Sequence, residues 1–147
     1  MSIIFSQFTI DLYEEVLSLW NECDGIGLSD ADSRGSIKAY LERNPGMSFV
    51  ANANDNIVGA ILCGHDGRRG YIHHLAVRYA YRRQGIGRKL VEKSLSVLQA
   101  IGIQKCHLFI FNNNVGGIEF WENIGWTHRK ELNLMSKNIK EILASIR

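Results

Sequence analysis

A basic stretch with two glycines lies near the middle of the chain, at residues 79–93 (YAYRRQGIGRKLVEK). Because Gly85 and Gly87 lack Cβ atoms, an anion can approach the main-chain N–H groups around them closely. Between Gly67 and Val91 the sequence carries seven cationic residues and no acidic residue: Arg68, Arg69, Arg78, Arg82, Arg83, Arg88 and Lys89. The stretch therefore predicts a site for a polyanionic ligand.

Three kinds of phosphate-binding loop compete for this stretch. A Walker A loop needs a serine or threonine after its lysine, and the segment GIGRKL has no hydroxyl there. A Rossmann turn needs a third glycine where this chain has Leu90. Its glycines also follow the strand tightly, whereas the strand predicted at 70–77 ends well before Gly85. The remaining interpretation is a pyrophosphate cradle of main-chain N–H groups that run into a helix N-terminus. The alternative is a loop that only turns the chain, with the arginines as a solvated face.

The hydrophobic pattern predicts the elements that position this loop. Runs of β-forming residues predict strands at 2–9, 47–53, 56–66, 70–77, 105–112 and 126–136. Helical spacing of apolar residues predicts helices at 9–24, 34–44, 86–101 and 115–124, with a last helical turn at 140–147. In segment 86–101 the apolar residues fall on one half of the helical wheel and the charged residues on the other.

The order of these elements predicts an α/β (α+β) fold, in which a mixed sheet carries helices on both faces. The connection from strand 70–77 through helix 86–101 is long enough to make strand 105–112 its parallel neighbour. The length of 147 residues matches one domain, predicted to span residues 1–147, and 46% hydrophobic residues are enough for a core.

The composition limits the classes of function. The net charge of +2 argues against a general nucleic-acid binder. The N-terminus lacks the pattern of a signal peptide, and no apolar segment is long enough to span a bilayer, so we expect no membrane partner. Cys23, Cys63 and Cys106 are dispersed, which predicts reduced thiols in a cytoplasmic protein and no metal site.

Two motifs together resemble the GNAT superfamily of N-acetyltransferases. Segment LAVRYAYRRQGIGRKLVEKSL is similar to the acetyl-CoA signature of that family, carried here by Leu75, Val77, Arg82, Gly85 and Gly87. Segment NNNVGGIEFWENIGW is similar to a second family motif, carried by Asn114, Phe120, Trp121, Glu122, Gly125 and Trp126. The order of elements agrees as well, so the resemblance covers nearly the whole chain.

The resemblance implies a mostly antiparallel sheet that splays at a β-bulge and binds acetyl-CoA as a co-substrate, without a metal. The implied pyrophosphate site comprises Arg82, Arg83, Gln84, Gly85, Ile86, Gly87 and Arg88. The pantetheine arm is expected to pair with the freed backbone of Leu75, Ala76 and Val77. Asn114 and Trp121 complete the implied cofactor site.

The implied reaction is direct acetyl transfer to a primary amine in a ternary complex. An N–H group near Ala76 or Val77, most directly that of Val77, would stabilise the oxyanion. The candidate bases are His73 and His74, which we expect on opposite faces of their strand, one toward the cleft and one under a helix. A structural role for both stays open. Where some relatives carry a glutamate base, this chain has Phe109.

The general acid of the family is missing from its usual place. Many relatives carry a tyrosine where this chain has Trp121, and an indole N–H is not an acid at neutral pH. The resemblance then implies slower chemistry, with solvent, Tyr79 or Tyr81 as proton donor, or a Trp121 that only packs.

The acceptor side is less specific. Glu22, Asp24, Asp30 and Asp32 lie between the first two predicted helices, where the family binds its acceptor, and predict a cationic amine unless they are solvated loop carboxylates. Small molecules and peptides both stay open as acceptors, and a homodimer is also open. Two other functions remain as alternatives: a CoA-binding sensor that is catalytically weak, and a basic nucleic-acid face, which the pyrophosphate loop disfavours.

Overall fold

The computed structural model describes residues 2–139, so the helical turn predicted at 140–147 lies outside the described residues. The chain forms two compact units, Met1–Asn114 and Val115–Arg147. No helix within residues 2–139 is long and apolar enough to cross a membrane.

The first unit is built on one five-stranded sheet whose strands follow the order of the sequence. The strands are β1 (Ile3–Gln7), β2 (Phe49–Ala53), β3 (Asn56–His65), β4 (Gly70–Val77) and β5 (Cys106–Leu108). Strands β1 to β4 pair antiparallel, whereas β4 and β5 pair in parallel. The predicted mixed sheet and the parallel pair are therefore confirmed.

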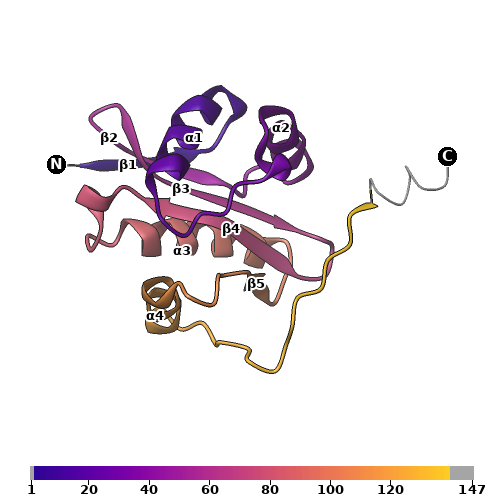
Figure 1. The fold of residues 1–147 in the computed structure, drawn as a ribbon. Coiled ribbons are helices and arrows are strands. Elements are labelled where there is room, and N and C mark those ends of the chain that lie inside the picture. The colour runs from indigo at the N-terminus through magenta and orange to yellow at the C-terminus, as the bar shows by residue number, and fades with distance from the viewer. Residues whose placement is uncertain (1, 140–147) are drawn as a thin grey trace. The chain divides into compact units, whose positions relative to one another are not determined.

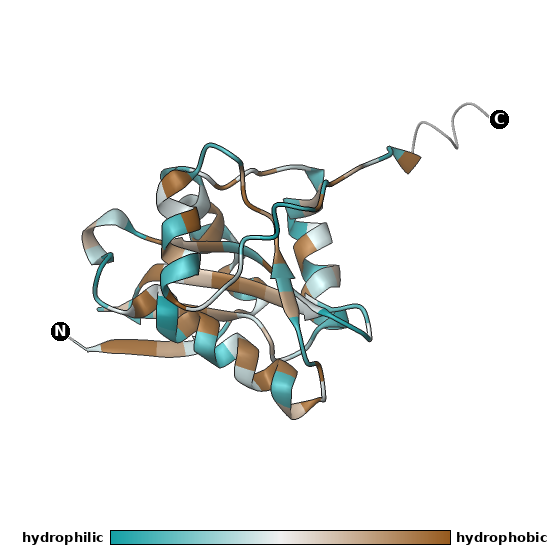
Figure 2. Cartoon of the chain, turned by 90° about the horizontal axis from the view of Figure 1, so that it is seen from below, coloured by the Kyte–Doolittle hydropathy of each residue, from teal (hydrophilic) through white to brown (hydrophobic). Residues whose placement is uncertain are grey.

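Helices cover both faces of this sheet, as Figure 1 shows. Helices α1 (Tyr13–Glu22) and α2 (Arg34–Arg43) lie on one face, and α3 (Ile86–Ala100) lies on the other. Short 3-10 turns η1 (Ile10–Leu12), η2 (Asp30–Asp32) and η3 (Tyr79–Tyr81) precede α1, α2 and α3. Figure 2 shows that the strands are mostly hydrophobic, whereas the helices mix hydrophobic and hydrophilic residues, because each helix buries one side only.

The core lies between the sheet and these two helical layers. On the α1 and α2 side, Trp20 and Leu19 are fully buried against Leu62, Ala60 and Ala76. On the α3 side, the buried residues recur at helical spacing, in agreement with the wheel predicted for 86–101: Ile86, Leu90, Val91, Ser94 and Leu98. Both faces of β4 are thus packed, which holds this strand firmly in the sheet.

A β-bulge interrupts the pairing of β3 and β4. Ala60 faces Ala76 and Leu62 faces His73, so one β3 residue lies opposite two residues of β4. The extra residue is accommodated at His74, whose backbone has a φ of 52°. Such a left-handed conformation costs a non-glycine residue of the order of 1–3 kcal/mol, and it persists only where surrounding contacts hold it.

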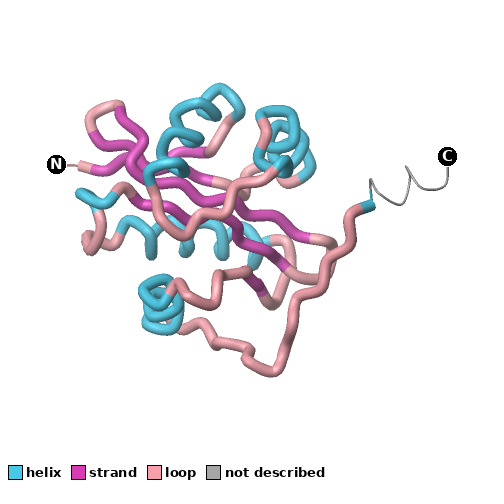
Figure 3. Tube along the Cα trace, in the orientation of Figure 1, coloured by secondary structure: helices cyan, strands magenta, loops and turns pink. Residues whose placement is uncertain are grey.

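Two predictions about the end of the sheet are wrong. The strand predicted at 105–112 is only Cys106–Leu108, and residues 126–136 form no strand, as the loop drawn after α4 in Figure 3 shows. A strand exists only where its N–H and C=O groups pair with a neighbour. Among the described residues no segment pairs with 126–136, so the β-rich composition there has no partner to make it a strand.

The second unit contains one helix, α4 (Val115–Asn123), among its described residues. Gly125, with a φ of 101°, ends this helix and donates its N–H to Glu122 O at 3.0 Å. The indole of Trp121 packs against that of Trp126, with ring centroids 4.8 Å apart, and against Phe120 at 5.3 Å. An aromatic cluster therefore organises this unit.

Candidate active site

The glycine-containing turn leads directly into α3. Arg83 and Gly85 both adopt positive φ values, 62° and 82°, and no side chain caps the helix start at Gly85. Within the described residues, no hydrogen bond is donated by the main-chain N–H groups of residues 83–88. A Cβ atom at Gly85 would meet nothing within 4 Å. Free N–H groups at the positive end of a 15-residue helix can bind an anion, as predicted for this turn.

Cationic side chains surround the turn. Arg82, Arg83, Arg88 and Lys89 are all exposed. Arg88 Nε lies 3.3 Å from Glu92 Oε1, whereas no ion pair in the described part of the chain involves Arg83 or Lys89. Arg82 also has no ion pair there and donates only to the carbonyl of Val77. Three positive charges next to the free N–H groups therefore remain uncompensated, which favours a ligand with more than one negative charge.

The edge of β4 is open between the bulge and this turn. Strand β5 pairs only with Gly70–Ile72, and within the described residues no strand pairs with residues 73–77 on that side. The predicted splay of the sheet is therefore present. Five residues of backbone edge lead from the histidines to the turn, where an extended ligand can add like a strand.

The N–H group of Val77 points toward this open edge. The next residue, Arg78, donates its N–H to Val58 O of β3 at 2.7 Å. Because bonded and non-bonded pairs alternate along an antiparallel ladder, the polar groups of Val77 point away from β3 and those of Ala76 point toward it. In agreement, Val77 O accepts a hydrogen bond from Arg82 Nε at 2.9 Å. Of the two predicted oxyanion donors, geometry thus favours Val77.

The two histidines lie on the same side of the sheet, so the prediction of opposite faces is wrong. The His73 ring contacts Tyr40 of α2 edge-on, with centroids 6.0 Å apart, and stacks with Phe109 at 6.5 Å. The His74 ring contacts Trp20 of α1 at 5.1 Å. The bulge is the reason, because the extra residue at His74 breaks the alternation of side chains along β4.

Burial lowers the pKa of His73 below its ordinary value of 6.5, and the neighbouring charge of His74 lowers it further, against the opposing effect of Asp32. A lowered pKa leaves the imidazole of His73 neutral at pH 7, so that it can accept a proton. The stacked Phe109 is 58% exposed and lies where relatives were expected to place a glutamate. Where a carboxylate base was expected from the relatives, this structure therefore has an aromatic ring stacked on the imidazole of His73.

His74 has a carboxylate partner that the sequence did not reveal. Its Nε2 lies 2.8 Å from Asp32 Oδ1, and Asp32 is only 8% exposed. The two residues are 42 positions apart, on η2 and on the bulge of β4, so no spacing in the sequence connects them. A buried Asp–His pair fixes the orientation of the imidazole ring.

The predicted acidic acceptor surface is smaller than expected, because two of its four acids are paired within the protein. Glu22 forms an ion pair with Arg78, and the carboxylate of Asp32 is held by His74 and by the N–H of Ser29 at 3.0 Å. Asp24 and Asp30 are exposed. Of the four acids, two are thus committed to contacts within the protein, and two are free to face a cationic substrate.

The loop between α1 and α2 packs against the segment that follows β5. A Cβ atom at Gly25 would lie 2.7 Å from Asn114 Nδ2, and one at Gly27 would lie 2.7 Å from the Phe111 ring. Glycine is required at Gly25 for a second reason, its φ of 85°. Asn114, predicted at the cofactor, therefore lies beside the predicted acceptor loop. Trp121 belongs to the second unit, and its role at the cofactor stays a prediction.

Comparison with known sequences identifies the family. The model of the acetyltransferase (GNAT) family matches residues 11–126. An acetyltransferase of Sodalis glossinidius (strain morsitans) is 31% identical over 134 residues, which make up 91% of this chain and 94% of that protein.

Two solved structures share the fold. The PaiA N-acetyltransferase of Thermoplasma acidophilum, in complex with coenzyme A, has a TM-score of 0.77 at 19% identity over 86% of this chain and 91% of its own. The structure of AAC(6')-Iy in complex with the bisubstrate analog CoA-S-monomethyl-acetylneamine has a TM-score of 0.76 at 13% identity over 94% and 99% of the two chains. The resemblance seen in the two motifs is confirmed: this chain belongs to the GNAT family and is an N-acetyltransferase.

Proposed function

We propose that this protein transfers the acetyl group of acetyl-CoA directly to a primary amine within a ternary complex. The observation that carries the proposal is the continuity of the open β4 edge, from the bulge at His74 to Val77, with the uncapped turn at the start of α3. The CoA-bound state of the PaiA structure, which shares the fold, supports acetyl-CoA as the donor.

The turn and the strand edge divide the donor between them. The N–H groups of residues 83–88 hold the pyrophosphate, and the exposed guanidinium of Arg83 adds a charge-assisted hydrogen bond. The pantetheine arm lies along Leu75, Ala76 and Val77, where the outward N–H of Val77 bonds an acyl oxygen. This hydrogen bond strengthens as negative charge develops on that oxygen in the transition state.

The amine must be neutral before it attacks. At pH 7 the deprotonation of a lysine-like amine, with a pKa of about 10.4, costs about 4.6 kcal/mol, whereas an α-amino group with a pKa near 8 costs about 1.4 kcal/mol. His73 and His74 lie at the bulge on the side of the α1–α2 loop and are the bases that the site offers. They matter most for a strongly basic acceptor.

The departing thiolate has no dedicated acid at the usual position, which Trp121 occupies. If the thiol of CoA resembles that of cysteine, with a pKa of about 8.5, its release as thiolate at pH 7 forgoes only about 2 kcal/mol. Protonation by solvent is then sufficient, and the enzyme is slower than it would be with a tyrosine there.

The acceptor is a cationic amine on this account. Asp24 and Asp30 are exposed on the loop that lies beside the bulge, and Phe109 and Phe111 present open aromatic faces, which attract ammonium groups. The AAC(6')-Iy structure, which shares the fold, holds the bisubstrate analog CoA-S-monomethyl-acetylneamine, which supports a small-molecule amine as acceptor. A peptide amine would use the same groups.

Calorimetry combined with a thiol-release assay tests the proposal. Titration of acetyl-CoA should give heat with a one-to-one stoichiometry, and mixing acetyl-CoA with a panel of primary amines should release free thiol. A protein that binds acetyl-CoA but releases no thiol with any amine would instead be a CoA-dependent sensor. A protein that gives no heat with CoA or acetyl-CoA would contradict the proposed site as well.

A further inference from the structure

We propose that Asp32 is a positioning residue that holds the imidazole of His74 with its hydrogen on Nε2, so that Nδ1 takes the proton from the acceptor amine. The inference rests on the proposed function and assigns the base within it. It follows from the contacts around η2, which the sequence did not connect to the histidines.

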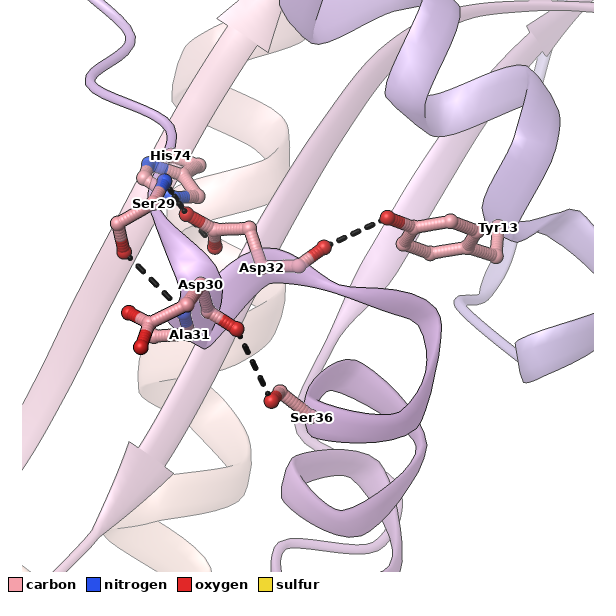
Figure 4. Close-up of polar contacts among 7 residues, drawn as sticks. All are labelled: Tyr13, Ser29, Asp30, Ala31, Asp32, Ser36 and His74. Carbon is pink, nitrogen blue, oxygen red and sulfur yellow. Dashed lines mark hydrogen bonds and ion pairs between the residues drawn. The ribbon is translucent and has the colours of Figure 1, made fainter. Parts of the chain in front are cut away.

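The carboxylate of Asp32 is fixed on every side that the structure describes (Figure 4). Its Oδ1 lies 2.8 Å from His74 Nε2, and its Oδ2 accepts the N–H of Ser29 at 3.0 Å in a capping box. Its main-chain carbonyl accepts the hydroxyl hydrogen of Tyr13 at 2.6 Å. A carboxylate held this way accepts hydrogen bonds and donates none, so the hydrogen between Asp32 and His74 belongs to Nε2.

The imidazole is fixed from the other side by packing and by the backbone. The edge of Trp20 meets the ring at a centroid distance of 5.1 Å, and the side chain of His74 is 18% exposed. The left-handed backbone at His74, with a φ of 52°, turns the ring toward η2. The side chain therefore keeps a small exposed part, and Nδ1 is the nitrogen left with a lone pair.

Proton transfer to this atom balances the reaction. The ammonium of the acceptor gives one proton to Nδ1, which forms an imidazolium that the carboxylate of Asp32 stabilises. The amine lone pair then attacks the thioester carbon, the C–S bond breaks, and CoA leaves as thiolate. The nitrogen loses its remaining extra proton to solvent as the amide forms, solvent protonates the thiolate, and the imidazolium returns its proton to solvent.

The tautomer can be measured without any substrate. Nitrogen-15 NMR of the imidazoles should show His74 as a single Nε2–H tautomer in the wild-type protein. The Asp32→Asn variant should show a mixture of tautomers, or the Nδ1–H form, because its amide can donate to Nε2. Tyr13→Phe is the matched control, since it removes a hydrogen bond to the same residue and leaves the carboxylate in place.

The kinetic test uses two kinds of acceptor. For alkyl primary amines, Asp32→Asn should lower kcat about 10-fold to 100-fold while the KM for acetyl-CoA stays unchanged. For weakly basic amines, with a pKa near 8, the loss should be several times smaller, because little is gained from a base. Tyr13→Phe should leave kcat unchanged for both classes of amine. His74→Gln should lower kcat for each class as much as Asp32→Asn does.

The outcomes separate this inference from the proposed function. An Nε2–H tautomer that persists in Asp32→Asn, or an unchanged kcat in a folded Asp32→Asn, overturns the positioning role even when acetyl transfer is observed. A kcat that falls equally for strongly and weakly basic amines makes Asp32 a structural residue. If no amine is acetylated although the tautomer behaves as expected, the proposed function fails and the Asp32–His74 contact stands.

Discussion

His73 links the stability of the protein to pH. Burial lowers its pKa in the folded protein below the ordinary 6.5, so the unfolded chain binds a proton at this residue more readily than the folded one. Stability contributed by neutral His73 is present above pH 6.5 and is lost as the pH falls from 6.5 toward the lower folded-state pKa.

The free energy of unfolding should therefore decrease as the pH falls below 6.5, in part because of His73. Urea midpoints of the wild type should fall between pH 7.5 and pH 5, and the fall should be smaller in His73→Gln, which has no group that titrates there. His128→Gln, which changes an exposed histidine, should keep the wild-type slope. A wild-type slope in His73→Gln would show that other groups cause the pH dependence.

Gly85 is the residue at which the turn depends most on the absence of a side chain. Alanine at its φ of 82° should destabilise the protein by about 1 kcal/mol, and its Cβ would lie where the pyrophosphate approaches. Gly35→Ala is the control, because Gly35 lies within α2 with free space around it, and alanine there should stabilise by about 0.5–1 kcal/mol. If Gly85→Ala has the stability of the wild type and an unchanged affinity for CoA, the turn at Gly85 does not bind the pyrophosphate.

Trp121 tests the missing acid. Trp121→Tyr should raise kcat, because a tyrosine could protonate the leaving thiolate. The activation barrier should fall by at most about 2 kcal/mol, the free energy that release of an unprotonated thiolate forgoes. Trp126→Tyr changes the other indole of the same edge-on pair and should leave kcat unimproved. Steady-state kinetics with saturating acetyl-CoA decide this, and a Trp121→Tyr variant that is no faster would show that the indole has only a packing role.

At the scale of elements, the periodic segments could be predicted from the sequence and the irregular ones could not. Helix α3 and strand β4 lie where the apolar pattern placed them, because burial on one side leaves a repeating signal. The bulge at His74 adds a single residue, which no periodic pattern in the sequence reveals. It places His73 and His74 on the same side of the sheet, where opposite sides were predicted. The Asp32–His74 contact joins segments far apart in sequence, so only the fold could show it.

The strand predicted at 126–136 failed for a related reason. Leu132 and Leu134 alternate with polar residues as they would in a strand, but both are exposed. β-propensity reports how a residue packs against neighbours in a sheet, so it predicts a strand only where such neighbours exist. In contrast, the uncapped turn before α3 could be predicted because positive φ values at glycine are a local property of the backbone.

The basic turn should act as an electrostatic element. Arg83→Gln should weaken CoA binding about 10-fold to 100-fold, since a hydrogen bond to a charged group contributes about 1.5–3 kcal/mol. Arg68→Gln removes the same charge from the exposed hairpin before β4, at the opposite end of that strand, and should change the affinity little. Titrations at several salt concentrations check both variants, and equal losses would indicate a diffuse charge effect in place of a contact at the turn.

At the scale of the molecule, one sheet brings donor and acceptor groups together. Helix α3 lies on one face of the sheet, with the proposed anion site at its N-terminus, while α1, α2 and the loop between them lie on the other face (Figure 1). On that second face, the carboxylate of Asp32 reaches His74 at the bulge. Strand β4 connects the two sites, because its outward edge is unpaired between them. On the proposed mechanism, this strand would hold the acetyl donor at Val77 and the proton acceptor at His74.

Amide chemical shifts during a titration with CoA test this arrangement most directly. The N–H signals of Val77 and of residues 83–88 should move together and saturate at one equivalent of CoA, while those of residues 66–69 at the other end of β4 should stay in place. Saturable binding that leaves the signals of Val77 and residues 83–88 unmoved would contradict this arrangement.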